Sequence, residues 1–373
     1  MRLLLATDVT VRGGVDGYVL VLADALRRAG HEVVVLIERT TTSALRDQAA
    51  SRGLAVKLAK LYHGAYRLAE LHDAARTVLD ELRPDGVHVV CGSPWSCLAL
   101  REVAADRDLL VVVTEQQVDA ALVMTPELCE RVRATYLAAR TVIFVSEGNR
   151  ATMGRLVGLD GVSHYVIPNG VDTVGLPRVR PQSARMNTRG ARLVTAARLA
   201  PEKMLHLLVE AVSILPTTLV QRVDLFGEGP ERDNLLGLIR EHSLGSRVLV
   251  HPWHPHMVEQ LASYDLFVLP SRAEGMSFAL LEAMAVGLPV IASNIAGNAE
   301  ALLHGNAGTL VTQGDSAALA DGIRQALTRP IQTERRARIA AVHVRAHHEL
   351  SALMLRTVDL WATKQTGTVQ RTL

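Results

Sequence analysis

The alternation of short apolar runs with amphipathic helical segments is the feature that most constrains how this chain can fold. In the first half, an apolar run at residues 3–6 precedes a glycine turn and a helical pattern over residues 18–29. Further runs occupy residues 32–37, 109–113 and 142–145. The same rhythm restarts after residue 190, with runs at residues 192–196, 222–226, 248–250, 266–269 and 289–292. Such runs are typical of strands buried on both faces of a parallel sheet. The sequence therefore predicts an α/β chain with two doubly wound, Rossmann-like domains.

A change in composition marks the predicted domain boundary. Residues 172–190 contain prolines and several arginines without an apolar period, which is typical of a linker. We expect residues 1–171 to form one domain and residues 191–341 another. Residues 342–373 would be a helical segment that can cross back to the first domain. Ligands of open α/β sheets bind at the carboxyl ends of the strands, so two sheets facing across a cleft would suit a two-substrate reaction.

Composition excludes several classes of protein. Hydrophobic residues make up 49% of the 373 residues, and the formal net charge of +2 gives no electrostatic basis for nucleic-acid binding. The 3 cysteines form no CxxC pair, which argues against a disulfide scaffold or a zinc module. No apolar stretch approaches the ~18 residues of a membrane helix, and Asp8 comes too early for a signal peptide. We expect a cytoplasmic protein without membrane association; its oligomeric state stays open.

A glycine turn, Gly13-Gly14, lies between the first predicted strand and helix. Glycine there lets backbone amides approach a phosphate or a sugar, although a tight turn without a ligand is the alternative. A dinucleotide fingerprint is excluded by register, because Arg12 stands where its first glycine would be when Gly14 and Gly17 are the other two.

The second half carries a basic pair, Arg198 and Lys203, in the segment AARLAPEK after a predicted strand. Pro201 is expected to begin a helix, so Lys203 lies where the helix dipole disfavours a cation. A dianionic group docked between the two cations would explain this placement, and a solvated surface pair is the alternative.

Two carboxylates flank another predicted helix start in the segment EGMSFALLEAMAVGLPVIAS, where Glu274 lies in the loop and Glu282 in the second turn. Ser277 can cap this helix, whose free amides suit a diphosphate. Carboxylates accept hydrogen bonds from vicinal hydroxyls, so the set suits a nucleotide-sugar. The alternative for Glu282 is an ordinary helix-surface acid.

In these segments the chain resembles a retaining glycosyltransferase of family 4, with the GT-B fold. Glu274 and Glu282 match the Glu-x7-Glu element of that family, and Arg198 and Lys203 match its basic pair. The nucleotide loop is matched by Gly227 in GEGP, the domain-crossing segment by VIPNGVD, and the N-terminal glycines by Gly13-Gly14. The resemblance covers nearly the whole chain.

The resemblance implies a role for each matched position. Arg198 and Lys203 would neutralise the donor diphosphate, Glu274 would bind sugar hydroxyls, and Glu282 would bind ribose hydroxyls. No catalytic metal and no cofactor are implied, and the donor is a nucleoside-diphosphate sugar, UDP being favoured over GDP or ADP. The remaining donor-binding positions are Gly14, Gly227, Ser277, Phe278, Ala279 and Leu280.

Two segments depart from the family pattern. Thr114-Glu115-Gln116 stands where the family often has T-x-H, so Gln116 would replace a histidine on the acceptor side, near Gly13. Glutamine can bind a sugar hydroxyl but cannot shuttle a proton. After residue 250 the chain has HPWHPH instead of a glycine, and Trp253 either stacks on the donor base or fills an apolar gap. The prolines make a metal site at these histidines improbable.

The sequence thus predicts an enzyme that transfers a sugar to a hydroxyl of a small polar acceptor, such as a cyclitol or an aminocyclitol intermediate of natural-product biosynthesis. The alternatives are a nucleotide-sugar epimerase or phosphorylase on the same scaffold, and a catalytically inactive nucleotide-sugar binding protein.

Overall fold

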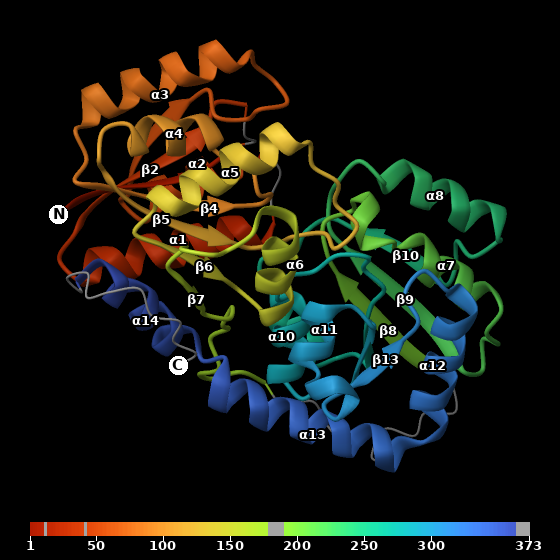
Figure 1. The fold of residues 1–373 in the computed structure, drawn as a ribbon. Helices are drawn as coiled ribbons and strands as arrows, with labels where there is room; N and C mark the ends of the chain where they lie inside the picture. The colour runs from red at the N-terminus through yellow and green to blue at the C-terminus, as the bar shows by residue number, and fades with distance from the viewer. Residues whose placement is uncertain (11–12, 41–42, 178–189, 363–373) are drawn as a thin grey trace. The chain divides into compact units, whose positions relative to one another are not determined.

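Two separate parallel sheets hold the strands of the computed structural model, which describes residues 1–10, 13–40, 43–177 and 190–362 (Figure 1). Contacts divide the chain into two compact units. The first unit is Met1–Pro168 together with the chain from Ala352 onward, and the second unit is Asn169–Ser351. Most of the predicted linker, residues 178–189, and residues 363–373 of the predicted C-terminal segment lie outside the described residues.

The first unit is built on a seven-stranded sheet with the strand order β3-β2-β1-β4-β5-β6-β7. Its strands are β1 (Arg2–Thr7), β2 (Glu32–Glu38), β3 (Ala55–Ala59), β4 (Gly86–Cys91), β5 (Leu110–Glu115), β6 (Thr141–Phe144) and β7 (His164–Val166). Its helices are α1 (Gly14–Arg28), α2 (Ser43–Ser51), α3 (Leu68–Leu82), α4 (Leu98–Ala105), α5 (Pro126–Ala138), α6 (Glu147–Val157) and most of α14 (Leu350–Ala362).

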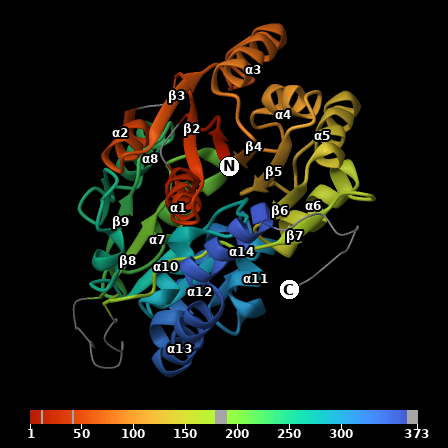
Figure 2. The same ribbon diagram turned by 90° about the vertical axis from the view of Figure 1, so that its left-hand side faces the viewer.

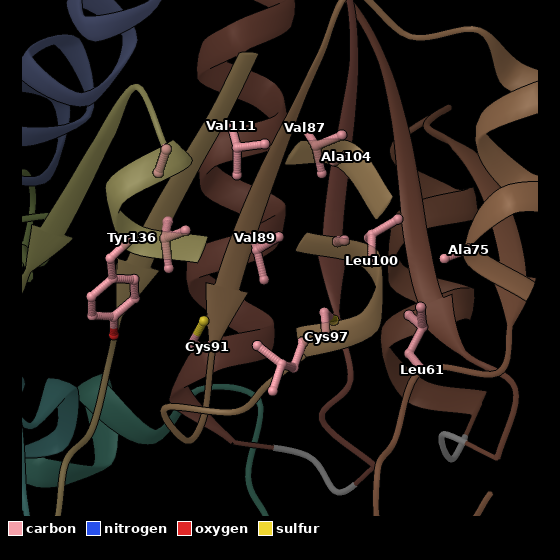
Figure 3. Packing of buried hydrophobic residues seen from close by; sticks show 14 of the residues in the cluster. Leu61, Ala75, Val87, Val89, Cys91, Cys97, Leu100, Ala104, Val111 and Tyr136 are labelled. Carbon is pink, nitrogen blue, oxygen red and sulfur yellow. The ribbon is translucent and has the colours of Figure 1, made fainter. Parts of the chain in front are cut away.

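Helices cover both faces of this sheet. Apolar side chains of α3, α4, α5 and α6 pack with those of the strands into one buried cluster, part of which Figure 3 shows. Helices α1 and α14 lie on the opposite face (Figures 1 and 2). This explains why the strands are apolar without alternation, since neither of their faces meets water.

The second unit is built on a six-stranded sheet with the strand order β10-β9-β8-β11-β12-β13. Its strands are β8 (Ala191–Ala196), β9 (Val220–Phe226), β10 (Val248–His251), β11 (Leu266–Leu269), β12 (Val290–Ser293) and β13 (Thr309–Val311). Its helices are α7 (His206–Ser213), α8 (Arg232–Glu241), α9 (Met257–Leu261), α10 (Phe278–Ala285), α11 (Ala296–Ala301), α12 (Ser316–Thr328) and α13 (Pro330–His347). Helices α7, α8 and α12 share an apolar cluster with the sheet.

The predicted α/β class with two doubly wound domains is confirmed. Each apolar run that predicted a strand is one, with ends displaced by at most two residues. Strands β3, β4, β7 and β13 were not predicted. No helix in the described part of the chain has the length and apolar character that crossing a bilayer requires.

Three predicted helices were wrong in detail. Helix α1 begins at Gly14 rather than at residue 18, because the Asp16 carboxylate accepts the backbone N–H of Gly13 and closes the first turn. Pro201 begins a short 3₁₀ helix, Pro201–Lys203, which ends where Met204 adopts a φ of 47°. The predicted C-terminal helix is broken at His348, so that it forms parts of α13 and α14.

Candidate active site

Four loops of the second unit share one edge of its sheet. They follow β8, β9, β10 and β11, which are parallel and adjacent, so their carboxyl ends meet at the same edge. The loops carry the basic pair, the GEGP segment, the histidine-rich segment and the loop before α10. All the candidate donor-side residues of the second unit therefore gather at this edge or on α10.

Lys203 and Glu274 form an ion pair, although 71 positions separate them in the chain. Lys203 Nζ lies 2.7 Å from Glu274 Oε1, and both side chains are largely buried, at 11% and 6% exposure. The Ser271 hydroxyl donates to the same Glu274 Oε1 at 2.7 Å. Glu274 is thus fixed by two donors from different loops, which is the kind of support that orients a binding carboxylate.

Arg198 is paired differently. Its guanidinium binds the carboxylate of Glu202, four residues further along the same segment. The Arg198 side chain is 34% exposed, so it remains open to solvent. In this structure each cation of the predicted pair has its own carboxylate.

Helix α10 begins as the sequence indicates. Ser277 is its N-cap, and the Ser277 hydroxyl oxygen accepts the backbone N–H of Leu280 at 3.4 Å. Glu282 follows in the second turn and is half-buried. Desolvation, with the charge of Glu259 as a second cause, raises the pKa of Glu282 to about 7. Phe278 and Ala279 stand in the first turn, where helix amides have no partner within the helix.

The loop before α10 is held in place by Gly297 of α11, a residue that the sequence analysis did not single out. A Cβ atom at Gly297 would lie 2.2 Å from the Gly275 carbonyl oxygen and 2.5 Å from that of Glu274. Only glycine permits this contact of helix backbone with loop backbone. The sequence signal that could have identified Gly297 is the Gly-Asn pair near the start of a helix that follows a buried strand.

The GEGP segment packs directly on the chain that follows β8. Gly227 and Gly229 have φ angles of 152° and 151°, and Cβ atoms there would lie 1.9 Å and 2.3 Å from the carbonyl oxygens of Ala197 and Leu199. The Leu199 N–H donates to the Glu228 carbonyl at 2.8 Å. These glycines therefore position the Arg198 segment, and this packing role does not depend on ligand binding.

The histidine-rich segment after β10 contains a buried carboxylate contact that was also missed. Asp224, on β9, is fully buried and accepts from His251 Nε2 at 2.6 Å, from the Tyr264 hydroxyl at 3.1 Å and from Arg222. Burial alone would raise the pKa of Asp224. The hydrogen-bond donors outweigh this effect and hold the pKa below its ordinary value. The His251 ring stacks on Phe226 with centroids 4.6 Å apart.

Trp253 lies in the same segment and is 40% exposed. Part of its side chain therefore faces solvent. Within the described ranges, no three His, Cys, Asp or Glu side chains are grouped as metal ligands.

The candidate acceptor-side residues belong to the first unit. Gly13 is extended, with a φ of −172°, and a Cβ atom there would have no neighbour within 4 Å, so the backbone does not require glycine at this position. Gln116 follows β5, is 5% exposed, and donates its backbone N–H to the Cys91 carbonyl at 3.1 Å. Gly14 is the first residue of α1.

The preceding residue, Glu115, is completely buried and accepts the Tyr136 hydroxyl at 2.5 Å. Burial raises the pKa of Glu115, although the nearby Arg101 guanidinium acts in the opposite direction. The buried side chains of Glu115, Tyr136 and Arg101 thus lie together next to Gln116 at the end of β5. The sequence did not reveal this cluster, because its members come from three different elements.

The two parallel sheets and the helices that cover them define a two-domain α/β protein. Two family models match the chain: Glycosyltransferase Family 4 over residues 12–174 and Glycosyl transferases group 1 over residues 180–342. Together with the fold, which is GT-B, these matches place the chain among the family 4 type of glycosyltransferases.

Curated relatives are similar over different shares of the chain. Glycogen synthase of Mycobacterium tuberculosis is 31% identical over 54% of this chain and 49% of its own length. The chain thus spans about half the length of that relative. Phosphatidyl-myo-inositol mannosyltransferase of Mycobacterium leprae is 27% identical over 90% of both chains.

Solved structures show the same fold at low identity. HepE of Anabaena in complex with UDP and glucose has a TM-score of 0.80, at 20% identity, over 98% of this chain and 100% of the other. Sucrose-phosphate synthase of Thermosynechococcus elongatus has a TM-score of 0.78, at 20% identity, over 97% and 98%.

Proposed function

We propose that this protein transfers a sugar from a UDP-sugar to a hydroxyl group of a small polar acceptor, with retention and without a catalytic metal. The Lys203–Glu274 ion pair carries the proposal, because it brings a cation and a carboxylate together in the loops near the start of α10. Structures similar to this one contain UDP or UDP-glucose, which supports a UDP-sugar donor.

In the proposed donor site, different residues bind the diphosphate, the sugar, the ribose and the base of the nucleotide-sugar. The α10 amides and Lys203 would hold the diphosphate, with Arg198 leaving Glu202 to complete the charge neutralisation. Glu274 would bind sugar hydroxyls and Glu282 the ribose hydroxyls. Trp253 would stack on the base, which its exposure permits.

The proposed reaction exchanges one bond to the anomeric carbon for another. The bond from that carbon to the diphosphate oxygen breaks, and the acceptor hydroxyl oxygen forms the new bond on the same face. The hydroxyl proton passes to the departing phosphate oxygen. Lys203 and Arg198 stabilise the negative charge that develops on the leaving group, which is electrostatic catalysis. Gln116 would position the acceptor or sugar by hydrogen bonding.

The proposed acceptor is a cyclitol or an aminocyclitol. The mannosyltransferase relative that matches 90% of the chain is named for phosphatidyl-myo-inositol, whose headgroup is a cyclitol. We expect free inositol or an amino-substituted analogue to accept sugar from the donor. Transfer to neither, with hydrolysis of the donor only, would contradict this acceptor class and leave the donor assignment standing.

A thermal-shift panel of UDP, GDP, ADP and NAD tests the class of ligand. A ligand that binds only the folded state raises the midpoint of unfolding, so we expect UDP to give the largest increase and NAD none. A response to NAD alone would refute a nucleotide-sugar site.

Two substitutions test the division of roles. Glu274→Gln keeps the Ser271 hydrogen bond but loses its charge, so we expect most sugar transfer to disappear while the dissociation constant for UDP changes little. Arg198→Ala should raise the barrier by on the order of 3 kcal/mol. Arg324→Ala is its matched control, because Arg324 also pairs with an acid close to it in the chain, Asp321, but lies at an exposed position of α12. Normal turnover in Arg198→Ala would remove the leaving-group role.

A further inference from the structure

The side chain of Asn169 connects the start of the second unit to the loop before α10. Asn169 is the first residue of that unit and is only 1% exposed. Its Nδ2 donates to the Met276 carbonyl at 2.9 Å. Met276 directly precedes the N-cap Ser277, so this hydrogen bond fixes the residue from which the first turn of α10 departs.

The segment where the chain leaves the second unit is bonded to the same place. His348 Nδ1 lies 2.9 Å from the Asn169 carbonyl oxygen, which can only accept, so Nδ1 carries the proton. The Val171 N–H donates to the His348 carbonyl at 2.9 Å, and Val171 and Glu349 form a parallel bridge. His348 is 4% exposed. The entry and exit segments of the second unit therefore lie side by side.

The other end of α10 is held by α13, the helix that directly precedes His348. Helix α13 packs against α10 (Figures 1 and 2), and Arg345 Nη2 donates to the Ala285 carbonyl at 2.9 Å. Ala285 is the last residue of α10. These hydrogen bonds form a closed ring. Asn169 binds the loop before α10, Arg345 binds the last residue of α10, and His348, which follows α13, binds Asn169.

We propose that Asn169, Arg345 and His348 are positioning residues for the donor diphosphate. They touch no substrate; they hold both ends of α10 and so fix the direction of its first-turn amides. This inference rests on the proposed function, in which those amides bind the diphosphate. It assigns the entry and exit segments a role in donor affinity beyond linking the two units.

The alternative is that these hydrogen bonds only stabilise the second unit. The two roles differ in what a substitution changes. A purely structural bond lowers the midpoint of unfolding and leaves ligand affinity alone, whereas a positioning bond also changes the affinity and the local opening of α10.

The experiment compares Asn169→Ala with Thr333→Val. The Thr333 hydroxyl donates to the Ala326 carbonyl at 2.8 Å and is also buried in the second unit. Thr333→Val therefore removes a comparable buried hydrogen bond, but one that does not hold either end of α10. For both variants we would measure UDP affinity by calorimetry and hydrogen exchange of the segment 271–285 without ligand. We expect Asn169→Ala to weaken UDP binding about tenfold and to speed exchange of that segment. Thr333→Val should change neither.

His348 supplies a second pair of variants if Asn169→Ala does not fold. His348→Asn retains an N–H donor close to the position of Nδ1, and His348→Leu does not. Rescue by asparagine, with weakened UDP binding in the leucine variant, would support positioning. UDP affinity within twofold of the original in the leucine variant, or in Asn169→Ala, would overturn it. If the original protein binds no UDP, GDP or ADP, the proposed function fails. Unchanged hydrogen exchange of the segment 271–285 in Asn169→Ala or His348→Leu would refute the positioning role independently of ligand binding.

Discussion

Glu282 carries a carboxyl group whose protonation state changes near neutral pH. Burial on α10 and the charge of Glu259 raise its pKa to about 7 from an ordinary value of 4.5. Between those values the folded protein binds a proton that the unfolded chain has released. The free energy of unfolding therefore falls as pH rises from 4.5 to 7, and the loss is complete above pH 7.

We expect Glu282→Gln to raise the free energy of unfolding of the ligand-free protein at pH 8 by about 2 kcal/mol, because the amide is never charged. The same variant should bind UDP more weakly, since ribose hydroxyls lose a charged acceptor. Urea denaturation and calorimetry at pH 8 measure the two effects. Glu241→Gln, at an exposed position of α8, is the control and should change stability by less than about 0.5 kcal/mol. A less stable Glu282→Gln would contradict the assignment.

At the scale of residues, the sequence suggested candidate side chains but not which of them contact one another. The ion pair of Lys203 with Glu274 joins two segments that were considered separately. Contacts across 71 positions depend on strand order, which a single sequence does not contain. Asp224 was missed for the same reason, because its partners come from other segments of the second unit.

At the scale of elements, the turn after β9 is determined by its contact with the chain after β8. Gly229 has a φ of 151°, and a Cβ atom there would meet the Leu199 carbonyl oxygen at 2.3 Å. Because the obstacle is backbone, an alanine can be accommodated only if the Arg198 segment moves. The glycine is therefore explained by packing before any ligand is considered.

We expect Gly229→Ala to lower the free energy of unfolding by about 3 kcal/mol and to impair transfer, since Arg198 would be displaced. Gly237→Ala is the matched control. Gly237 lies inside α8, where a new Cβ would approach only the flexible Arg240 side chain at 4.0 Å. Alanine there should raise stability by about 0.5–1 kcal/mol. Equal effects of the two substitutions, measured by urea denaturation, would show that the Leu199 contact is unimportant.

The elements that the sequence failed to predict are those with weak apolar periods. Strand β3 includes Lys57, β7 and β13 are three residues long, and β4 contains His88 and begins at Gly86. Long uniform apolar runs were located within two residues because burial on both faces leaves no other pattern. For the irregular strands, pairing with neighbours decides the structure, and that information is not local.

At the scale of the whole chain, the carboxyl-terminal helix α14 returns to the first unit, and buried polar side chains take part in this contact. Trp361 of α14 donates its indole N–H to His88 Nδ1 at 3.4 Å, and His88 Nε2 lies 2.8 Å from the Thr114 hydroxyl. A Cβ atom at Gly86 would lie 2.5 Å from the Trp361 ring, so glycine makes room for the indole. Because indole only donates, His88 must be neutral with its proton on Nε2.

This contact predicts that acid weakens the docking of α14. Burial lowers the pKa of His88 from 6.5 to about 3, so between these values the unfolded chain binds a proton that the folded protein does not. The free energy of unfolding must then fall as pH decreases from 6.5 toward 3, by at most about 1.4 kcal/mol per pH unit from this group. His343, whose pKa burial lowers to about 4, adds a similar contribution in the second unit.

Substitution of His88 separates the two contributions. His88→Gln has no group to titrate, so its free energy of unfolding should depend less on pH between 6.5 and 4, while His343→Gln should show a comparable reduction from the second unit. Hydrogen exchange of the segment 350–362, expressed as protection factors corrected for the intrinsic rate at each pH, locates the effect. Acid should lower these protection factors in the original protein and less so in His88→Gln, whereas His343→Gln should behave there like the original. If the protection factors of that segment are independent of pH, His88 does not control how α14 is attached.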